Sequence, residues 1–157
     1  MRVAGLDAGT AKSHMVVWDF AVGMVRSIHR DVPNDIMLHS LRLLSKEVVS
    51  PRTCDAIAIE SMDARGMRLG QDTLDTILWI GRFQEASGGA LVPRSRVKDA
   101  ICGNRKADDA AIRLRLTDML GKPGTKKNPG PTFGIVNHCW QALAVAVTYY
   151  EMTRENR

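Results

Sequence analysis

Residues 2–10 read RVAGLDAGT, a short apolar run that ends in a carboxylate, Asp7, and then in a Gly-Thr turn signal. The pattern predicts a buried strand that ends at Asp7 and leads into a functional loop. Residues 55–60, DAIAIE, repeat it, with alternating Ile and Ala before Glu60. If these strands are neighbours in a parallel sheet, both acids lie at the same edge, where ligands of α/β sheets usually bind.

Outside these two segments, short apolar runs predict strands, and apolar residues at helical spacing predict helices. We expect further strands at residues 14–19, 24–29 and 90–92, and helices from about residue 34 to a point before Pro51, over 71–86, from Asp108 or Asp109 to 120, and over 138–152. Residues 121–134, GKPGTKKNPGPTFG, are too rich in Gly and Pro for either element and are expected to form a loop. The order predicts an α/β fold with one mixed sheet, in which three antiparallel strands precede the parallel ones.

The composition is that of an ordinary globular protein. The chain has 157 residues, of which 45% are hydrophobic and 25% charged, so we expect one domain over residues 1–157. Three widely spaced cysteines favour reduced thiols over a disulfide framework. The N-terminus lacks the features of a signal peptide, and no apolar run is long enough to span a membrane, so we expect a soluble, intracellular protein.

The positive charge is concentrated in one stretch. The formal net charge is +5, and residues 94–127 alone hold ten basic residues against four acidic ones, a surplus of six. Such a stretch can be a solvated surface or a surface that follows a phosphate backbone. The best candidates for backbone contacts are Arg94, Arg96, Lys98, Arg105, Lys106, Lys126 and Lys127.

Two acids that meet at the end of a sheet raise each other's pKa unless a positive charge compensates them, and a divalent cation is the natural compensation. Taken singly, Asp7 and Glu60 are also explained as strand-end caps, but their matched contexts favour a functional pair. His138 and Gln141 are three residues apart at the start of the last predicted helix, which places them on one face. A helix cap or a core histidine remains an alternative to a ligand role for His138.

The ordered set of motifs resembles the RuvC-type Holliday-junction resolvases over nearly the whole chain. It comprises GLDAGT at the N-terminus, IAIES at the end of the fourth strand, RVKDAICG followed by KADDAAI, and ALAVAV in the last helix. GMRLGQDTLDTILWIGRFQEA and GTKKNPGPTFG look like the bacteriophage branch of that family. No single motif is specific, because GxDxGT also occurs in sugar kinases and actin-like ATPases.

The resemblance implies an RNase H-like fold with a five-stranded mixed sheet, a homodimer, and Mg²⁺-dependent cutting of four-way DNA junctions by two metal ions, with Mn²⁺ as a substitute. It implies no nucleotide cofactor and no membrane partner, and it implies a phage-encoded protein of the bacterial cytoplasm. By position, Asp7 and Glu60 match the first and second catalytic acids. The family has two acids in the last helix where this chain has His138 and Gln141, and an amide is a weaker ligand for Mg²⁺ than a carboxylate.

Two further residues are matched by the resemblance. Asp109 falls where many family members carry a lysine; it is a candidate metal ligand, or alternatively a helix cap. Lys98 matches a lysine near the scissile phosphate, where it would stabilise developing negative charge. Catalysis is therefore assigned to Asp7, Glu60, His138 and Lys98.

Two other functions remain open. A non-catalytic protein that binds branched DNA would explain Gln141 as a lost ligand. A phosphotransferase of the actin or sugar-kinase type would explain GLDAGT, but such enzymes enclose a nucleotide between two domains of this fold, and 157 residues are too few for two. Cutting of a labelled junction in the presence of divalent metal separates these interpretations.

Overall fold

The computed structural model describes residues 1–46, 54–63 and 70–155. Its centre is a five-stranded sheet with the strand order β3-β2-β1-β4-β5. The strands are β1 (Arg2–Ala8), β2 (Lys12–Asp19), β3 (Met24–Pro33), β4 (Ala56–Ser61) and β5 (Ala90–Pro93). β1, β2 and β3 pair antiparallel, whereas β4 pairs parallel with β1, and β5 parallel with β4. The predicted mixed sheet is confirmed.

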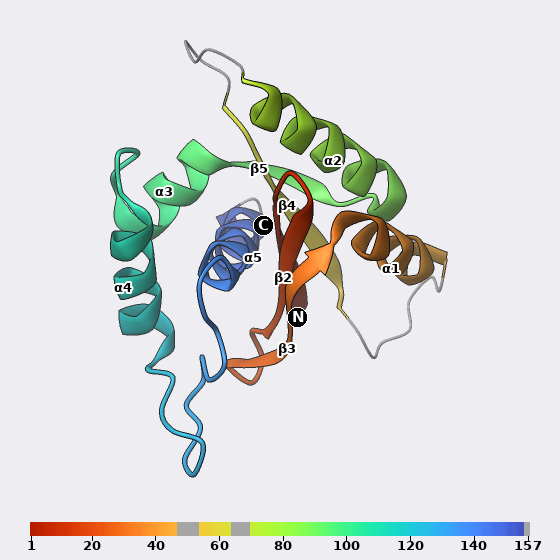
Figure 1. Ribbon diagram of the computed structural model, residues 1–157. Coiled ribbons are helices and arrows are strands. Elements are labelled where there is room, and N and C mark those ends of the chain that lie inside the picture. Colours follow the sequence, from red (N-terminus) through yellow and green to blue (C-terminus); the bar gives the residue numbers. More distant parts are fainter. Residues whose placement is uncertain (47–53, 64–69, 156–157) are drawn as a thin grey trace.

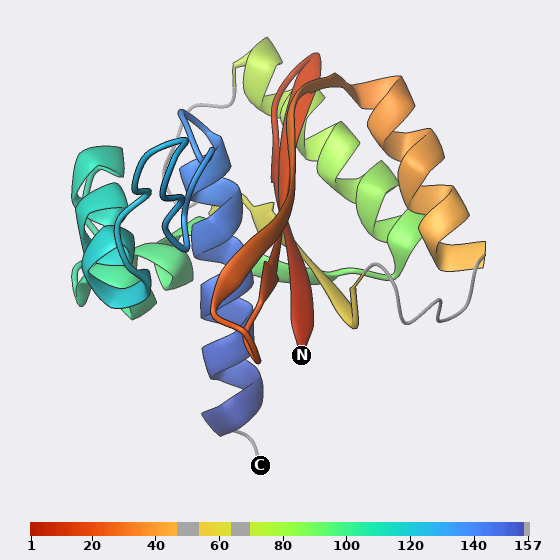
Figure 2. The same cartoon turned by 90° about the horizontal axis from the view of Figure 1, so that it is seen from below.

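Helices cover both faces of this sheet (Figures 1 and 2). They are α1 (Asn34–Lys46), α2 (Gln71–Ser87), α3 (Arg94–Cys102), α4 (Asp109–Leu120) and α5 (Cys139–Glu155). Seen edge-on in Figure 2, α1 and α2 lie on one side of the sheet and α3, α4 and α5 on the other. Each side has its own hydrophobic core, because the strands carry apolar side chains on both faces.

α5 is the most deeply buried helix. Its first ten residues, from Cys139 to Thr148, are all buried, and it packs against β1 and β2 in the centre of the sheet. The dense Ala and Val residues of this segment let the helix approach the strands closely. The start of α5 is thereby held near the end of β1, which is where the sequence placed the first acid.

The structure differs from the prediction at α3. No helix was expected over residues 94–102, yet they form one directly after β5. The helix is nine residues long, buries Val97 and Ile101, and has no side-chain cap hydrogen bond at Pro93. These two buried positions are one turn apart, and most of the residues between them are charged. The sequence therefore has too few regularly spaced apolar residues to predict a helix here.

The remaining local predictions agree with the structure. α2 ends at Gly88, which has a left-handed φ of 65° that glycine adopts without strain. Residues 121–138 contain no helix or strand beyond an isolated bridge between Gly124 and Pro129. The three cysteines are free, with Cys139 buried. Among the described helices, none combines the length and apolarity that crossing a lipid bilayer requires.

Candidate metal and DNA site

Asp7 and Glu60 meet at one edge of the sheet. β1 and β4 run parallel, and Leu6 pairs with Ile59. The residues that follow, Asp7 and Glu60, therefore lie side by side on the two strands. Both side chains are largely buried, with 14% of Asp7 and 9% of Glu60 exposed. The two carboxyl groups lie within hydrogen-bonding reach of each other. The pairing predicted from the two strand ends is therefore present.

Burial makes both acids weak. It raises the pKa of Asp7 to about 6, which Arg94 and the hydrogen bond from Glu60 offset only in part. Burial and then the adjacent charge of Asp7 raise the pKa of Glu60 to about 7, although Arg94 lowers it. Without a bound cation, the folded chain thus retains protons on this pair to a higher pH than on exposed acids, because two buried anions side by side are unfavourable.

His138 adds a nitrogen ligand to this pair. Its Nδ1 lies 3.4 Å from Oδ2 of Asp7, and 66% of its side chain is exposed. The His138 backbone carbonyl accepts from the N–H groups of Gln141 and Ala142, so the residue opens α5 while its ring faces the acids. The ring also stacks on the buried His14 of β2, with 5.2 Å between ring centres. His138 is therefore not a core histidine.

Asp108 and Asp109 have separate roles at the start of α4. Oδ1 of Asp108 accepts from the N–H of Ala111 at 2.8 Å, which is the N-cap hydrogen bond of this helix. Asp109 instead pairs with Arg94, whose Nη2 lies 2.8 Å from its Oδ1. Asp108 thus fills the capping role that was left open for Asp109. The Asp109 carboxylate lies close enough to act on the charge of Asp7, and we refer to Asp7, Glu60 and Asp109 together as the acid cluster.

Arg94 was expected on a DNA-contacting surface, and the structure places it in the acid cluster. It is the first residue of α3, directly after β5, and Pro93 of β5 pairs with Ser61 of β4. Its Nη1 donates to both carboxylate oxygens of Glu60, at 3.1 and 2.9 Å. The arginine therefore bridges Glu60 and Asp109. The sequence signal for this role was that Arg94, like Glu60, stands at a strand end.

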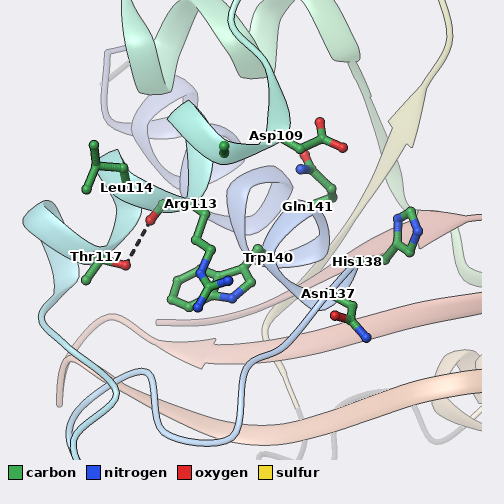
Figure 3. A pocket seen from close by; sticks show the side chains of 9 residues that line it. Asp109, Arg113, Leu114, Thr117, Asn137, His138, Trp140 and Gln141 are labelled. Carbon is green, nitrogen blue, oxygen red and sulfur yellow. Dashed lines mark hydrogen bonds between the residues drawn. The ribbon is translucent and has the colours of Figure 1, made fainter.

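Gln141 lies at the base of a groove of about 710 Å³ between α4 and α5, which Asp109 and His138 also line (Figure 3). Its side chain is buried, and its Oε1 has no hydrogen-bond partner among the described residues. A buried acceptor left unpaired is unfavourable by about 1–3 kcal/mol. Trp140, whose Nε1 is likewise buried without a partner, and Arg113 form another part of the lining.

These donors suit a hard divalent cation. Carboxylate oxygens of Glu60 and Asp109 flank the Arg94 guanidinium, which also acts on the charge of Asp7, and the amide oxygen of Gln141 lies in the groove that Asp109 lines. Oxygen ligands are those that Mg²⁺ and Mn²⁺ prefer. Within residues 1–46, 54–63 and 70–155, however, no three His, Cys, Asp or Glu side chains are spaced to hold an ion as they stand. Arg94 holds Glu60 and Asp109 in its own hydrogen bonds.

The other predicted basic residues lie around this site or away from it. Lys98 is half-buried on α3, one turn after Arg94 and so on the same face of the helix. Arg96 pairs with Glu155 at 3.4 Å, and Arg105 lies 3.8 Å from Asp99. The exposed residues Lys106, Lys126 and Lys127 stand in loops on either side of α4. The basic stretch is thus divided between the acid cluster and open surface.

Known proteins resemble this chain in sequence. No protein-family model matches the chain. The crossover junction endodeoxyribonuclease RuvC of Corynebacterium glutamicum is 28% identical over 180 aligned positions, which cover 100% of this chain and 79% of that protein.

Solved structures agree in fold. Thermus thermophilus RuvC in complex with a Holliday junction substrate matches with a TM-score of 0.66 and 19% identity, over 99% of this chain and 96% of the other. A second Thermus thermophilus RuvC structure matches with a TM-score of 0.61 and 20% identity, over 99% and 97%. By sequence and by its RNase H-like fold, this chain is a homologue of the RuvC-type Holliday-junction resolvases.

Proposed function

We propose that this protein is a metal-dependent endodeoxyribonuclease that resolves Holliday junctions and other branched DNA. The observation that carries the proposal is the meeting of Asp7, Glu60 and His138, with 3.4 Å between the His138 ring and the Asp7 carboxylate. The similarity to RuvC of Corynebacterium glutamicum, which extends over the whole chain, supports the same substrate class. The catalytic domain comprises residues 1–157.

The metal ligands are Asp7, Glu60 and His138, supplemented by Asp109 and Gln141. Two Mg²⁺ ions, or Mn²⁺ in their place, would supply Lewis acidity to the scissile phosphate and to the attacking water. The buried acids would hold and orient this charge, and a bound cation would offset the burial and mutual repulsion that raise their pKa values. Hydrolysis leaves 5′-phosphate and 3′-hydroxyl ends.

Lys98 is the proposed electrostatic catalyst. It lies one helical turn from Arg94 on α3, which places the two residues on the same face of the helix. Together with Arg96, Arg105, Lys106, Lys126 and Lys127, it would contact the phosphate backbone. These contacts give affinity that falls with salt and carry no sequence information.

Symmetrical cutting of two strands requires two sites related by a two-fold axis, so we propose a homodimer. Leu74, Ile77 and Leu78 form an exposed apolar row at helical spacing on α2, and Met62 before this helix is also exposed. Met67 and Leu69, which the sequence places in the same region, lie outside the described residues. Such a row suits burial against a second copy.

We propose that the protein acts in the bacterial cytoplasm and that a bacteriophage encodes it. The support is the likeness of residues 66–86 and 124–134 to the phage branch of the family.

The test is cleavage of a labelled four-way junction against linear duplex of the same sequence, with Mg²⁺ titrated from zero. We expect paired nicks near the crossover of the four-way junction that depend on the metal, and no cutting of the duplex. Tight junction binding without cutting at any Mg²⁺ or Mn²⁺ concentration would support the non-catalytic alternative instead. ATP turnover without cutting would support the phosphotransferase alternative.

A further inference from the structure

Arg94 occupies the acids that a bound cation would need. Its Nη1 donates to Oε1 and Oε2 of Glu60 at 3.1 and 2.9 Å, and its Nη2 donates to Oδ1 of Asp109 at 2.8 Å. Both oxygens of Glu60 are therefore engaged by one guanidinium. A carboxylate in this state has few lone pairs left for a metal ion.

The charges explain why this contact forms. Glu60 is largely buried, and a buried carboxylate is tolerated only when it is protonated or paired with a positive group. Arginine remains charged in any protein environment, so it compensates the acids whenever no other cation is present. A metal ion at Glu60 would compete with the guanidinium for the same two oxygens, and like charges 4 Å apart also repel by about 4 kcal/mol at the effective dielectric of a protein surface.

We propose that Arg94 is a positioning residue of the metal centre: it holds Glu60 and Asp109 in the metal-free protein and releases Glu60 when a divalent cation is bound. The inference rests on the proposed function, because it takes the acid cluster as a divalent-cation site. Asp109 is the second anchor. Arg94 contacts Asp109 through Oδ1, so the released guanidinium can stay beside the site on that oxygen while Oδ2 of Asp109 ligates the metal.

The experiment is a calorimetric titration of Mn²⁺ into the DNA-free protein and two variants. Arg94→Met removes the competing charge and keeps a long side chain. Arg26→Met is the matched control, because Arg26 donates from Nε and Nη2 to the buried Asp19, at 3.1 and 3.0 Å. Asp19 pairs with Arg2, at the opposite end of β1 from Asp7. The control therefore removes a similar ion pair far from the site.

We expect Arg94→Met to bind Mn²⁺ about tenfold more tightly than the wild type, which corresponds to about 1.4 kcal/mol. Arg26→Met should bind as the wild type does. Equal or weaker binding by Arg94→Met, with Arg26→Met unchanged, overturns the inference. If the wild type and both variants fail to bind Mn²⁺, the metal centre is absent and the proposed function itself is wrong, so the two failures are distinguishable.

If Arg94→Met does not fold, a measurement on the wild type can test the inference instead. The ¹⁵N–¹H signal of the Arg94 side chain, assigned with the conservative variant Arg94→Lys, is followed during a titration with diamagnetic Mg²⁺. We expect the signal to move toward the position of exposed arginines in proportion to the Mg²⁺ bound. A signal that stays in place at saturation overturns the inference.

Discussion

Gly5 of β1 lies against Ala142 of α5 so closely that a Cβ atom on Gly5 would overlap the Ala142 carbonyl oxygen and stand 2.8 Å from the backbone nitrogen of Ala146. Only a residue without a side chain allows this approach. Gly5 is two residues before Asp7 in the strand, and His138 and Gln141 are at the start of the helix. The contact therefore sets the distance between the sheet acids and the helix ligands.

Gly5→Ala is expected to lower the free energy of unfolding by about 3 kcal/mol or more, because backbone atoms cannot move aside as a side chain would. Urea denaturation measures this. Gly81→Ala in α2 is the control, since its Cβ meets nothing within 4 Å and alanine favours a helix by about 1 kcal/mol. If Gly5→Ala were as stable as the wild type, the close packing of α5 on β1 would be wrong.

Asp7→Asn is expected to reduce junction cleavage by more than about 100-fold, since even partners one step removed from metal ligands contribute 10–100-fold. Binding of the junction should stay equal or become tighter, because one negative charge near the phosphate is lost. Cleavage and gel-shift assays on one preparation measure both. Asp118→Asn, an exposed residue of α4, should cut at the wild-type rate. Full activity of Asp7→Asn would rule out the site.

The variant Gln141→Leu tests whether Gln141 is a metal ligand or only a residue of the core. It replaces a buried amide whose Oε1 is unpaired with an apolar side chain of similar size, so metal-free stability should be unchanged or higher. If Gln141 is a ligand, Mn²⁺ affinity should fall by about tenfold. Gln141→Glu should bind Mn²⁺ more tightly, because a carboxylate is the stronger ligand. Unchanged affinity in Gln141→Leu would remove this residue from the ligand set.

The metal-free protein is expected to lose stability as the pH rises from about 4 to 7. The pKa values of Asp7 and Glu60 are raised to about 6 and about 7, so the folded chain keeps protons that the unfolded chain has already released. Their contribution is complete below the pKa of the unfolded acids and is lost as the pH passes the folded values. For the coupled pair it is on the order of 2 kcal/mol.

Thermal melting in EDTA across this pH range measures the loss of stability. Glu60→Gln is the control, and its stability should depend less on pH. The lowered pKa of Asp19, about 2, acts only in stronger acid and does not interfere. A wild type and a Glu60→Gln variant with the same pH profile would show that the acids are not coupled as described.

The sheet was predictable because each strand is a short apolar run bounded by turn residues, and the runs at residues 2–7 and 55–60 each end in an acid. Asp7 and Glu60 could be paired for that reason. α3 was missed because Val97 and Ile101 are its only buried positions and no side chain caps its first turn. A nine-residue helix with so weak a period is fixed by its packing against α4 and α5.

The sequence did not predict that the Arg94 guanidinium lies among the acids. The basic stretch supplies several candidates, and Arg94 reaches Glu60 because Pro93 pairs with Ser61 at the end of the sheet. That pairing depends on strand order, not on the local sequence. The choice between Asp108 and Asp109 as the helix cap likewise needed the hydrogen bond to Ala111.

The most direct test of the metal centre is the anomalous difference map of a crystal soaked in Mn²⁺. We predict a peak that contacts both the Asp7 and Glu60 carboxylates, with the Arg94 guanidinium turned away from Glu60. A map in which Mn²⁺ is bound only elsewhere, or in which the acids keep their hydrogen bonds to Arg94 at saturating Mn²⁺, would contradict it.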